Sequence, residues 1–327
     1  MIRLGIDLRH VPTDGSPGAG IEHASNELAE ALRRYAHEYE IETIEFRGKM
    51  RASILAKRAR DKRIDALFCT TGAVPPLLPI VTFPWVHDVA IFTHPEWFPQ
   101  SRFKRLLTTR LFLRGVRRAP HVFAVSEDTK RALVGITGIE PEKITVTYQG
   151  VRLSTSHTTT GNYALMIGTV EPRKNIPFII ELWEDVRQAL GRDMRLVIVG
   201  KTGWGNVEIP SRDWIERVES ATDEERDRFL AGARVLLLPS LHEGFGRPAL
   251  EAMALGVPVV ASNRGAIPEI MGEVGTLLDP HDRAAWVSAV CDAFSGRLDG
   301  RDGKMRAALF SWERTARTIL AKVRESC

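Results

Sequence analysis

The segment EGFGRPALE, residues 243–251, combines two carboxylates, two glycines and a proline within nine positions. Glycine lacks a side chain, so the backbone N–H groups of such a segment can approach a ligand closely. Pro248 suits the first position of a helix, and the free N–H groups at a helix start favour a phosphate. Glu243 precedes this helix and Glu251 lies one turn inside it, where each can accept hydrogen bonds from sugar hydroxyls. The segment predicts a sugar-diphosphate site, with a capped helix whose Glu251 only balances the helix dipole as the alternative.

A second segment, GTVEPRKNIP at 168–177, places two cations before a helix start. Asn175 is a good N-cap residue, so Arg173 and Lys174 are expected to flank a helix N-terminus. Cations oppose the helix dipole there unless an anion is bound, which indicates diphosphate binding rather than two solvated surface cations. Lys201 adds a cation after the apolar run LVIVG, at the edge where α/β sheets bind ligands.

A third candidate is the pair His87 and Asp88, which follows an apolar run in the segment VHDVAIFTHPEWFP, residues 86–99. A histidine at the carboxyl end of a strand can meet a sugar hydroxyl or a departing phosphate. The alternative is a structural histidine, which is the more common role of a lone histidine.

The elements that position these residues alternate between strand and helix, which predicts an α/β protein with parallel sheets. The expected strands are 2–8, 41–46, 64–70, 80–86, 120–125 and 143–148, then 163–168, 195–200, 234–239 and 257–261. The expected helices with an apolar face are 21–35, 176–190 and 283–294. The run STSHTTTG, residues 154–161, has no periodicity and is typical of a linker. The predicted organisation is a first Rossmann-like domain at 1–153, a second at 162–308, and a C-terminal helix at 309–327 that can return to the first domain.

Composition narrows the class of protein. The 327 residues suffice for two cores, and three scattered cysteines exclude a disulfide framework and fit a reducing compartment. No signal peptide or membrane span is expected, so the predicted location is cytoplasmic. Two segments, 49–63 and 102–118, carry seven basic side chains each. Such segments can lie on an anionic membrane surface, at the inner face of the cell membrane, or form solvated helix faces.

Two other classes of protein fit the sequence less well. A nicotinamide-dependent oxidoreductase needs a G-x-G-x-x-G turn after the first strand, and GSPGAG at 15–20 does not have that spacing. A basic nucleic-acid-binding protein is suggested by the cationic segments, but no recognition module is present and both segments lie in one half of the chain. No nucleic-acid partner is therefore expected.

Taken together, these motifs resemble family 4 glycosyltransferases, which are retaining enzymes of the GT-B fold. EGFGRPALE fits that family's two glutamates separated by seven residues, and GTVEPRKN resembles the signature of its bacterial polysaccharide mannosyltransferase branch. Further family-like segments follow in the same order along the chain: HDVAIFTHPEWF, AVSEDTKRAL (124–133), KITVTYQGV and FSWERTA (310–316).

The resemblance implies roles for individual residues on the donor side. Glu243 contacts the donor sugar, Glu251 the nucleotide ribose, and Arg173 and Lys174 the diphosphate that leaves. The backbone of the loop supplies N–H groups to sugar and phosphate. The remaining donor-binding residues that it implies are Gly244, Phe245, Gly246, Gly168, Thr169, Lys201 and Val218, the last of them near the base. Many relatives have an arginine at the position of Thr169, so in this chain Arg173 is expected to contribute more to binding the diphosphate.

On the acceptor side, the resemblance implies that His87 faces the donor sugar from the first domain, with Asp88 beside it. The glycine-rich segment PGAGIEHAS (17–25), which contains Gly18 and Gly20, forms the loop near the acceptor and the donor phosphates. No Asp-x-Asp motif is present, so no metal or other cofactor is expected. GT-B enzymes of this kind stabilise the leaving diphosphate with cations and helix N-termini.

The function implied is transfer of a hexose, with mannose from GDP-mannose favoured, to a saccharide or lipid-linked saccharide in surface polysaccharide synthesis. Retention by front-face attack is favoured, with the phosphate accepting the proton of the acceptor. The alternatives are a UDP-sugar-dependent glucosyl- or N-acetylglucosaminyltransferase and a GT-B sugar-nucleotide epimerase, which acts without an acceptor.

Overall fold

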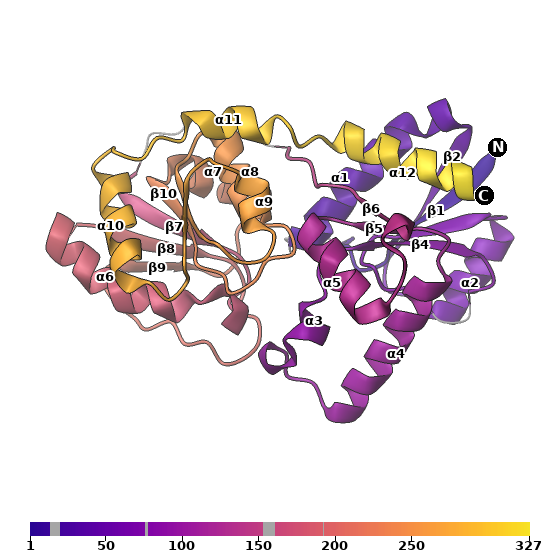
Figure 1. The fold of residues 1–327 in the computed structure, drawn as a ribbon, viewed down its shortest axis with the longest axis horizontal. Helices are drawn as coiled ribbons and strands as arrows, with labels where there is room; N and C mark the ends of the chain where they lie inside the picture. The colour runs from indigo at the N-terminus through magenta and orange to yellow at the C-terminus, as the bar shows by residue number, and fades with distance from the viewer. Residues whose placement is uncertain (14–19, 76–77, 153–160, 192) are drawn as a thin grey trace. The chain divides into compact units, whose positions relative to one another are not determined.

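The computed structural model describes residues 1–13, 20–75, 78–152, 161–191 and 193–327 (Figure 1). Its contacts divide the chain into two compact units. Unit 1 comprises Met1–Pro95, Gln100–Gly150 and Ser311–Cys327, and unit 2 comprises Glu96–Pro99 and Val151–Phe310. Of the predicted linker 154–161, all but Gly161 lies outside the described residues, as does Gly18.

Unit 1 is built on a six-stranded parallel sheet in the order β2-β1-β3-β4-β5-β6. Its strands are β1 (Ile2–Leu8), β2 (Ile41–Arg47), β3 (Ala66–Cys69), β4 (Val81–Val86), β5 (Val122–Ala124) and β6 (Ile144–Val146). Its helices are α1 (Gly20–Tyr35), η1 (Ala36–Tyr39), α2 (Ala52–Asp61), α3 (Ala90–Thr93), α4 (Arg102–Arg118), α5 (Glu127–Thr137), η3 (Pro141–Lys143) and α12 (Trp312–Ser326), while η2 (Pro95–Trp97) spans the boundary of the units.

The C-terminal helix α12 packs in unit 1, although it follows the whole of unit 2 in the chain. Trp312, its first residue, donates a hydrogen bond from Nε1 to Glu27 Oε2 (3.1 Å), and Thr315 donates to the carbonyl of Tyr148. A Cβ on Gly150 would lie 2.5 Å from the backbone nitrogen of Trp312, so only glycine permits this approach.

Unit 2 has a second six-stranded parallel sheet, in the order β12-β11-β10-β7-β8-β9. Its strands are β7 (Tyr163–Ile167), β8 (Arg195–Val199), β9 (Ile215–Val218), β10 (Val235–Leu238), β11 (Val259–Ser262) and β12 (Thr276–Leu278). Its helices are η4 (Pro172–Lys174), α6 (Ile176–Leu190), α7 (Asp223–Gly232), α8 (Arg247–Leu255), α9 (Ile267–Met271), α10 (Arg283–Phe294) and α11 (Arg301–Ala307). The α/β prediction of two doubly wound domains is confirmed.

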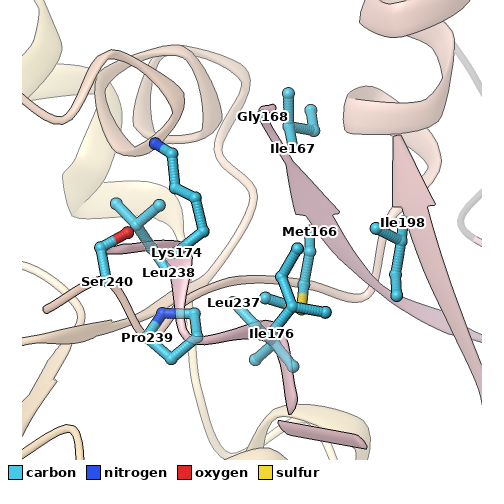
Figure 2. Close-up of a pocket in the computed structure, with 10 residues that line it drawn as sticks. All are labelled: Met166, Ile167, Gly168, Lys174, Ile176, Ile198, Leu237, Leu238, Pro239 and Ser240. Carbon is cyan, nitrogen blue, oxygen red and sulfur yellow. The ribbon is translucent and has the colours of Figure 1, made fainter. Parts of the chain in front are cut away.

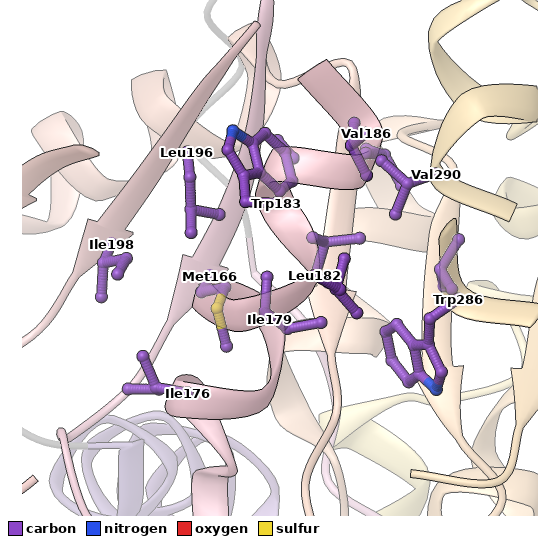
Figure 3. Close-up of a cluster of buried hydrophobic side chains, with 14 of the residues drawn as sticks. Met166, Ile176, Ile179, Leu182, Trp183, Val186, Leu196, Ile198, Trp286 and Val290 are labelled. Carbon is purple, nitrogen blue, oxygen red and sulfur yellow. The ribbon is translucent and has the colours of Figure 1, made fainter. Parts of the chain in front are cut away.

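The core of unit 2 explains why α6 is held firmly against the sheet (Figure 3). One face of α6, including Ile179 and Trp183, packs on strands β7 and β8 and on α10, which contributes Trp286. Both tryptophans are fully buried, and each satisfies its indole N–H with a backbone carbonyl. Burying a large apolar side chain stabilises the fold by about 1.5–3 kcal/mol. This packing fixes the start of α6, where the cationic segment lies.

Candidate functional site

The order of the strands in unit 2 locates its ligand-binding edge. From β7 the chain moves outward through β8 and β9, then returns to the other side of β7 with β10. Ligands of open α/β sheets bind where this reversal opens a crevice, at the carboxyl ends of the strands. Figure 2 shows the cavity at that point, and Lys174 and Ser240 are its polar side chains. The other lining residues are Met166, Ile167, Gly168, Ile176, Ile198, Leu237, Leu238 and Pro239.

Glu243 is the centre of a network of charges beside this cavity. It is 7% exposed, and its Oε1 accepts hydrogen bonds from Lys174 Nζ (2.5 Å) and Ser240 Oγ (2.7 Å). Its Oε2 accepts from Arg173 Nη1 (3.0 Å). Burial raises the pKa of Glu243, but the charges of Lys174 and Arg173 and the hydrogen bonds outweigh it and lower the pKa to about 2. Glu243 is therefore an ionised acceptor at neutral pH.

Arg173 joins two segments of the site. Its Nη1 also donates to the carbonyl of His242 (2.8 Å), and its own carbonyl accepts from the N–H of Leu241 (2.8 Å). Its Nη2 donates to Oε1 of Glu171 (2.5 Å), a second buried carboxylate. Burial raises the pKa of Glu171 despite the neighbouring cations. Neither Glu171 nor Ser240 is among the candidates expected from the sequence, although Glu171 lies inside the segment 168–177 and Ser240 lies three residues before Glu243.

Asn175 lies at the expected start of α6, but the prediction that its side chain caps the helix was wrong. Asn175 occupies the N-cap position of α6, but its backbone is left-handed (φ 53°) and its side chain does not cap the helix. Instead, its Nδ2 donates to the carbonyl of Pro280 (3.2 Å). Because Glu171 and Glu243 balance the charges of Arg173 and Lys174, the placement of these cations does not by itself require a bound anion.

Glycines allow the ends of β7 and β8 to meet. Gly168 and Gly200 have φ values of 142° and 143°, which side-chain-bearing residues rarely adopt. A Cβ on Gly200 would lie 2.1 Å from the carbonyl oxygen of Gly168, and one on Gly168 would lie 3.2 Å from Cε of Lys174. Gly168 therefore lies directly against the side chain of Lys174, and Gly200 lies against the backbone of Gly168.

Replacing Gly200 by alanine is expected to lower the free energy of unfolding by more than the roughly 1–3 kcal/mol that left-handed strain costs. The new methyl group would also push the Gly168 backbone and displace Lys174. Gly191→Ala is the matched control, because Gly191 has φ 108° and open space around its Cβ position. Urea unfolding of both variants measures the difference. Equal losses would show that the close approach of β7 and β8 is unimportant.

The second glutamate, Glu251, lies in α8 behind the loop. Gly246 is the N-cap of α8 with φ 90°, and the helix begins at Arg247, one residue before the predicted start at Pro248. Glu251 is 2% exposed, and its Oε1 accepts a hydrogen bond from Arg247 Nε (2.7 Å). Arg226 Nη2, from α7, lies 3.5 Å from the same oxygen. Neither Arg226 nor Arg247 is among the site residues expected from the sequence.

Close packing also holds the loop of Glu243. Gly265 lies against it so closely that a Cβ there would be 2.4 Å from the carbonyl oxygen of Glu243, which accepts from the N–H of Ala266 (2.8 Å). Gly244 is buried, and Phe245 packs edge-on against Phe310 with 6.1 Å between ring centroids. The loop is thus a fixed part of unit 2.

The remaining donor-side candidates lie along the same edge of the sheet but do not line the cavity of Figure 2. Lys201 follows β8 and is exposed, and its carbonyl accepts from the N–H of Val170 (3.0 Å). Thr169 is half-buried beside Gly203. Val218 is the last residue of β9, a strand that the sequence analysis missed.

In unit 1, the ring of His87 is engaged at both nitrogens. Its Nε2 lies 2.8 Å from the carbonyl oxygen of Thr70 and must donate to it, since a carbonyl only accepts. Its Nδ1 is therefore the acceptor for the amide Nε2 of Gln149 at 3.2 Å. Asp88 accepts from the N–H of Ala90 (3.2 Å), and Gly20 is the exposed first residue of α1. A contact of His87 with a sugar hydroxyl requires the exchange of one of these two hydrogen bonds.

The chain contains two doubly wound parallel sheets, and an ionised glutamate is held by two cations at the switch point of one of them. These features define a two-domain α/β protein of the GT-B class. Solved structures share this fold. Sucrose-phosphate synthase of Thermosynechococcus elongatus matches over 99% of both chains with a TM-score of 0.74 and 16% identity. Anabaena HepE, crystallised with UDP and glucose, matches over 100% of both chains with a TM-score of 0.72 and 17% identity.

Sequence comparisons identify the family. Residues 161–295 match the family described as glycosyl transferases group 1, and residues 47–155 match glycosyltransferase family 4. O-antigen chain mannosyltransferase B of Escherichia coli is 30% identical over 261 residues, which cover 72% of this chain and 68% of the relative. O-antigen chain mannosyltransferase RfbU of Salmonella typhimurium is 29% identical over 235 residues, 68% and 64% of the two chains. The chain belongs to the family 4 glycosyltransferases, and it is a glycosyltransferase.

Proposed function

We propose that the protein is a retaining, metal-independent mannosyltransferase that moves mannose from GDP-mannose to a saccharide or lipid-linked saccharide in surface polysaccharide synthesis. The observation that carries the proposal is the position of Glu243 between Arg173 and Lys174 at the switch point of unit 2. The names of the two bacterial relatives support mannose as the sugar and a polysaccharide as the product.

In this proposal the cations and the glutamate have separate tasks. Arg173 and Lys174 hold the diphosphate and stabilise the negative charge that develops as the bond between the anomeric carbon and the phosphate oxygen breaks. Glu243 accepts hydrogen bonds from hydroxyls of the donor sugar. The acceptor oxygen forms the new bond on the face from which the phosphate leaves, and its proton passes to a phosphate oxygen. His87 is a catalytic residue that faces the donor sugar, and Asp88 lies on the acceptor side.

The second candidate is a UDP-sugar-dependent glucosyl- or N-acetylglucosaminyltransferase. It is favoured by one observation, namely that the HepE structure of the same fold was obtained with UDP and glucose. A GT-B sugar-nucleotide epimerase is distinguished from both by product formation in the absence of an acceptor.

Thermal unfolding with GDP, UDP, ADP and dTDP tests the donor. A ligand that binds only the folded state stabilises it by about 2.7 kcal/mol at a concentration of 100 Kd, so the preferred base shows the largest shift. We expect GDP to give this shift and transfer from GDP-mannose to survive exhaustive EDTA treatment. A larger shift with UDP would favour the second candidate. An absolute requirement for added Mg²⁺ or Mn²⁺ would contradict the metal-independent mechanism.

We also propose that the protein works in the cytoplasm, at the inner face of the membrane, through α4. Along the described residues no helix combines the length and apolarity needed to cross a bilayer. The segment 102–118 has seven cations and no acidic residue, and it forms α4. The competing view, that Leu106, Leu107, Phe112 and Leu113 pack into the core, holds only in part: Leu106 and Leu107 are 50% and 48% exposed, whereas Phe112 and Leu113 are half-buried. Phe103 is 77% exposed, whereas Phe112 packs on Phe92.

Vesicle co-sedimentation is expected to show binding to anionic vesicles that falls with salt, and little binding to neutral vesicles. Each cation near an anionic surface contributes about 1 kcal/mol, fading within a Debye length. The double substitution Leu106→Ser and Leu107→Ser is expected to weaken binding, whereas Leu309→Ser, which alters an exposed leucine of unit 2, is expected to leave it unchanged. Equal binding to anionic and neutral vesicles would show that α4 is an ordinary solvated helix, and would favour a soluble acceptor.

A further inference from the structure

Glu251 and three charged side chains around it form a buried cluster that the proposed reaction does not yet use. Arg226 Nη2 donates to Asp227 Oδ1 (2.9 Å) and lies 3.5 Å from Glu251 Oε1. Arg247 Nε donates to the same Glu251 oxygen (2.7 Å). The side chains of Arg226 and Arg247 are 15% and 8% exposed, and Asp227 is also buried. We call these four residues the Glu251 cluster.

Helix stability does not account for the Glu251 cluster. Arg247 and Glu251 are an i,i+4 pair in α8, but the cation is at the N-terminal end and the carboxylate follows it, which is the less favourable order. Arg247 also lies in the first turn of α8, where the helix dipole disfavours a cation. Moreover, buried ion clusters are often no more stable than apolar side chains of similar size.

The geometry of the Glu251 cluster is directional. Both arginines approach Oε1 of Glu251, one from its own helix and one from α7. The other oxygen, Oε2, accepts no hydrogen bond from any residue that the structure describes. A carboxylate has about four lone-pair positions, two on each oxygen. The side chain is therefore held by one oxygen, and the other oxygen is left to accept from a ligand.

We propose that Arg226 and Arg247 are positioning residues that clamp Oε1 of Glu251, so that Oε2 accepts hydrogen bonds from the ribose hydroxyls of the donor nucleotide. This inference rests on the proposed function and on the ribose contact that the family resemblance implies for Glu251. It extends that function by assigning recognition of the ribose to a preorganised carboxylate on α8 together with a cation from α7. Asp227 completes the clamp by accepting a hydrogen bond from Nη2 of Arg226, the same nitrogen that faces Glu251.

The test compares GDP with 2′-deoxy-GDP and 3′-deoxy-GDP by calorimetric titration; the corresponding uridine set is used if UDP gives the larger thermal shift. A hydrogen bond to a charged group contributes roughly tenfold or more in affinity, so the wild-type protein is expected to prefer the ribonucleotide over at least one deoxy form by about that factor. Glu251→Gln is expected to lose most of this preference. Arg226→Met and Arg247→Met are expected to lose most of it as well.

The matched control is Arg228→Met, which alters an exposed arginine of the same helix α7 and is expected to keep the wild-type preference. Arg226→Lys retains the charge and removes the forked guanidinium, so it guards against a variant that does not fold. It is expected to lower the preference about two- to fourfold, since a single ammonium positions a carboxylate less well. In transfer assays the arginine variants are expected to raise KM for the donor more than they lower kcat.

The outcomes separate this inference from the proposed function. If Arg226→Met, Arg247→Met and Arg226→Lys all keep the wild-type preference while Glu251→Gln loses it, the clamp is refuted and the ribose contact stands. If the arginine variants weaken all three nucleotides equally, their role is structural or lies at the phosphates, and the clamp is again refuted. If the wild-type protein binds no nucleoside diphosphate, the proposed function fails and the clamp fails with it.

Discussion

Replacing Glu243 by glutamine is expected to lower kcat/KM for sugar transfer by roughly 100-fold or more, the cost typical of removing one preorganised electrostatic contact at a reacting centre. The amide keeps the shape of the side chain but loses the charge that orders Arg173, Lys174 and Ser240 around it. Both the acceptor for the sugar hydroxyls and the arrangement of the cations are lost together. Steady-state kinetics with saturating acceptor measure the effect, and Glu184→Gln, at an exposed glutamate of α6, is the control.

The Glu243→Gln variant is also expected to change how the free energy of unfolding depends on pH. The pKa of Glu243 lies at about 2 instead of the usual 4.5, so the folded state is stabilised by the ionised group. This shift corresponds to about 3 kcal/mol at neutral pH. The contribution is complete above about pH 4.5 and is lost as the pH falls through about 2. Urea unfolding of the wild-type protein and of Glu243→Gln is expected to differ at pH 7 and to converge in acid. If the difference in the free energy of unfolding does not change with pH, or if kcat/KM stays near the wild-type value, the assignment of Glu243 as an ionised site residue is contradicted.

The second large effect is expected from Arg173→Ala and Lys174→Ala. Each loses charge-assisted hydrogen bonds, which contribute about 1.5–3 kcal/mol, so nucleoside diphosphate binding is expected to weaken roughly tenfold or more. Transfer is expected to fall further, by about 100- to 1,000-fold, because the leaving diphosphate gains charge in the transition state. Binding of the free nucleoside is expected to change little. Calorimetric titration with nucleoside and diphosphate, below the unfolding transition of each variant, separates these effects.

The structure supplies the control for this pair. Arg195 is an exposed arginine in the same unit, but it begins β8 and therefore lies at the amino end of the strand, opposite to the site. Arg195→Ala is expected to bind and transfer normally. Arg173→Ala is expected to be the less stable of the two site variants, since it also loses contacts with Glu171 and the carbonyl of His242. Equal weakening of nucleoside and diphosphate would contradict the assignment of Arg173 and Lys174 to the diphosphate.

Much of the fold could be predicted from local sequence pattern. The predicted strand 2–8 and helices 176–190 and 283–294 agree with β1, α6 and α10 to the residue. Central strands of a parallel sheet are buried on both faces, so they appear as apolar runs, and packed helices repeat their apolar residues at helical spacing. The strands that were missed, β9 and β12, are the edges of the sheet in unit 2. Their residues are only half-buried, so they have no continuous apolar run.

The candidate site was predictable where its chemistry lies in short segments. The spacing of Glu243 and Glu251, the glycines between them and the cations at 173 and 174 all belong to local motifs. Parallel strands also carry their carboxyl ends to one edge, so the two motifs could be expected to meet. The direct contact of Glu243 with Lys174 was not predictable, because 69 residues separate them and their pairing depends on how the turn η4 approaches the loop after β10.

By itself, therefore, the sequence determined the α/β class, the doubly wound domains, the family and the side chains available for chemistry, because these depend on local periodicity and on short motifs. Only the tertiary structure decided which charges neutralise one another. In the folded chain, both ring nitrogens of His87 form hydrogen bonds, and Asn175 has a left-handed backbone and does not cap α6 with its side chain. Arg226 of α7 lies next to Glu251 of α8. These outcomes depend on packing between segments far apart in the chain, which no local pattern encodes.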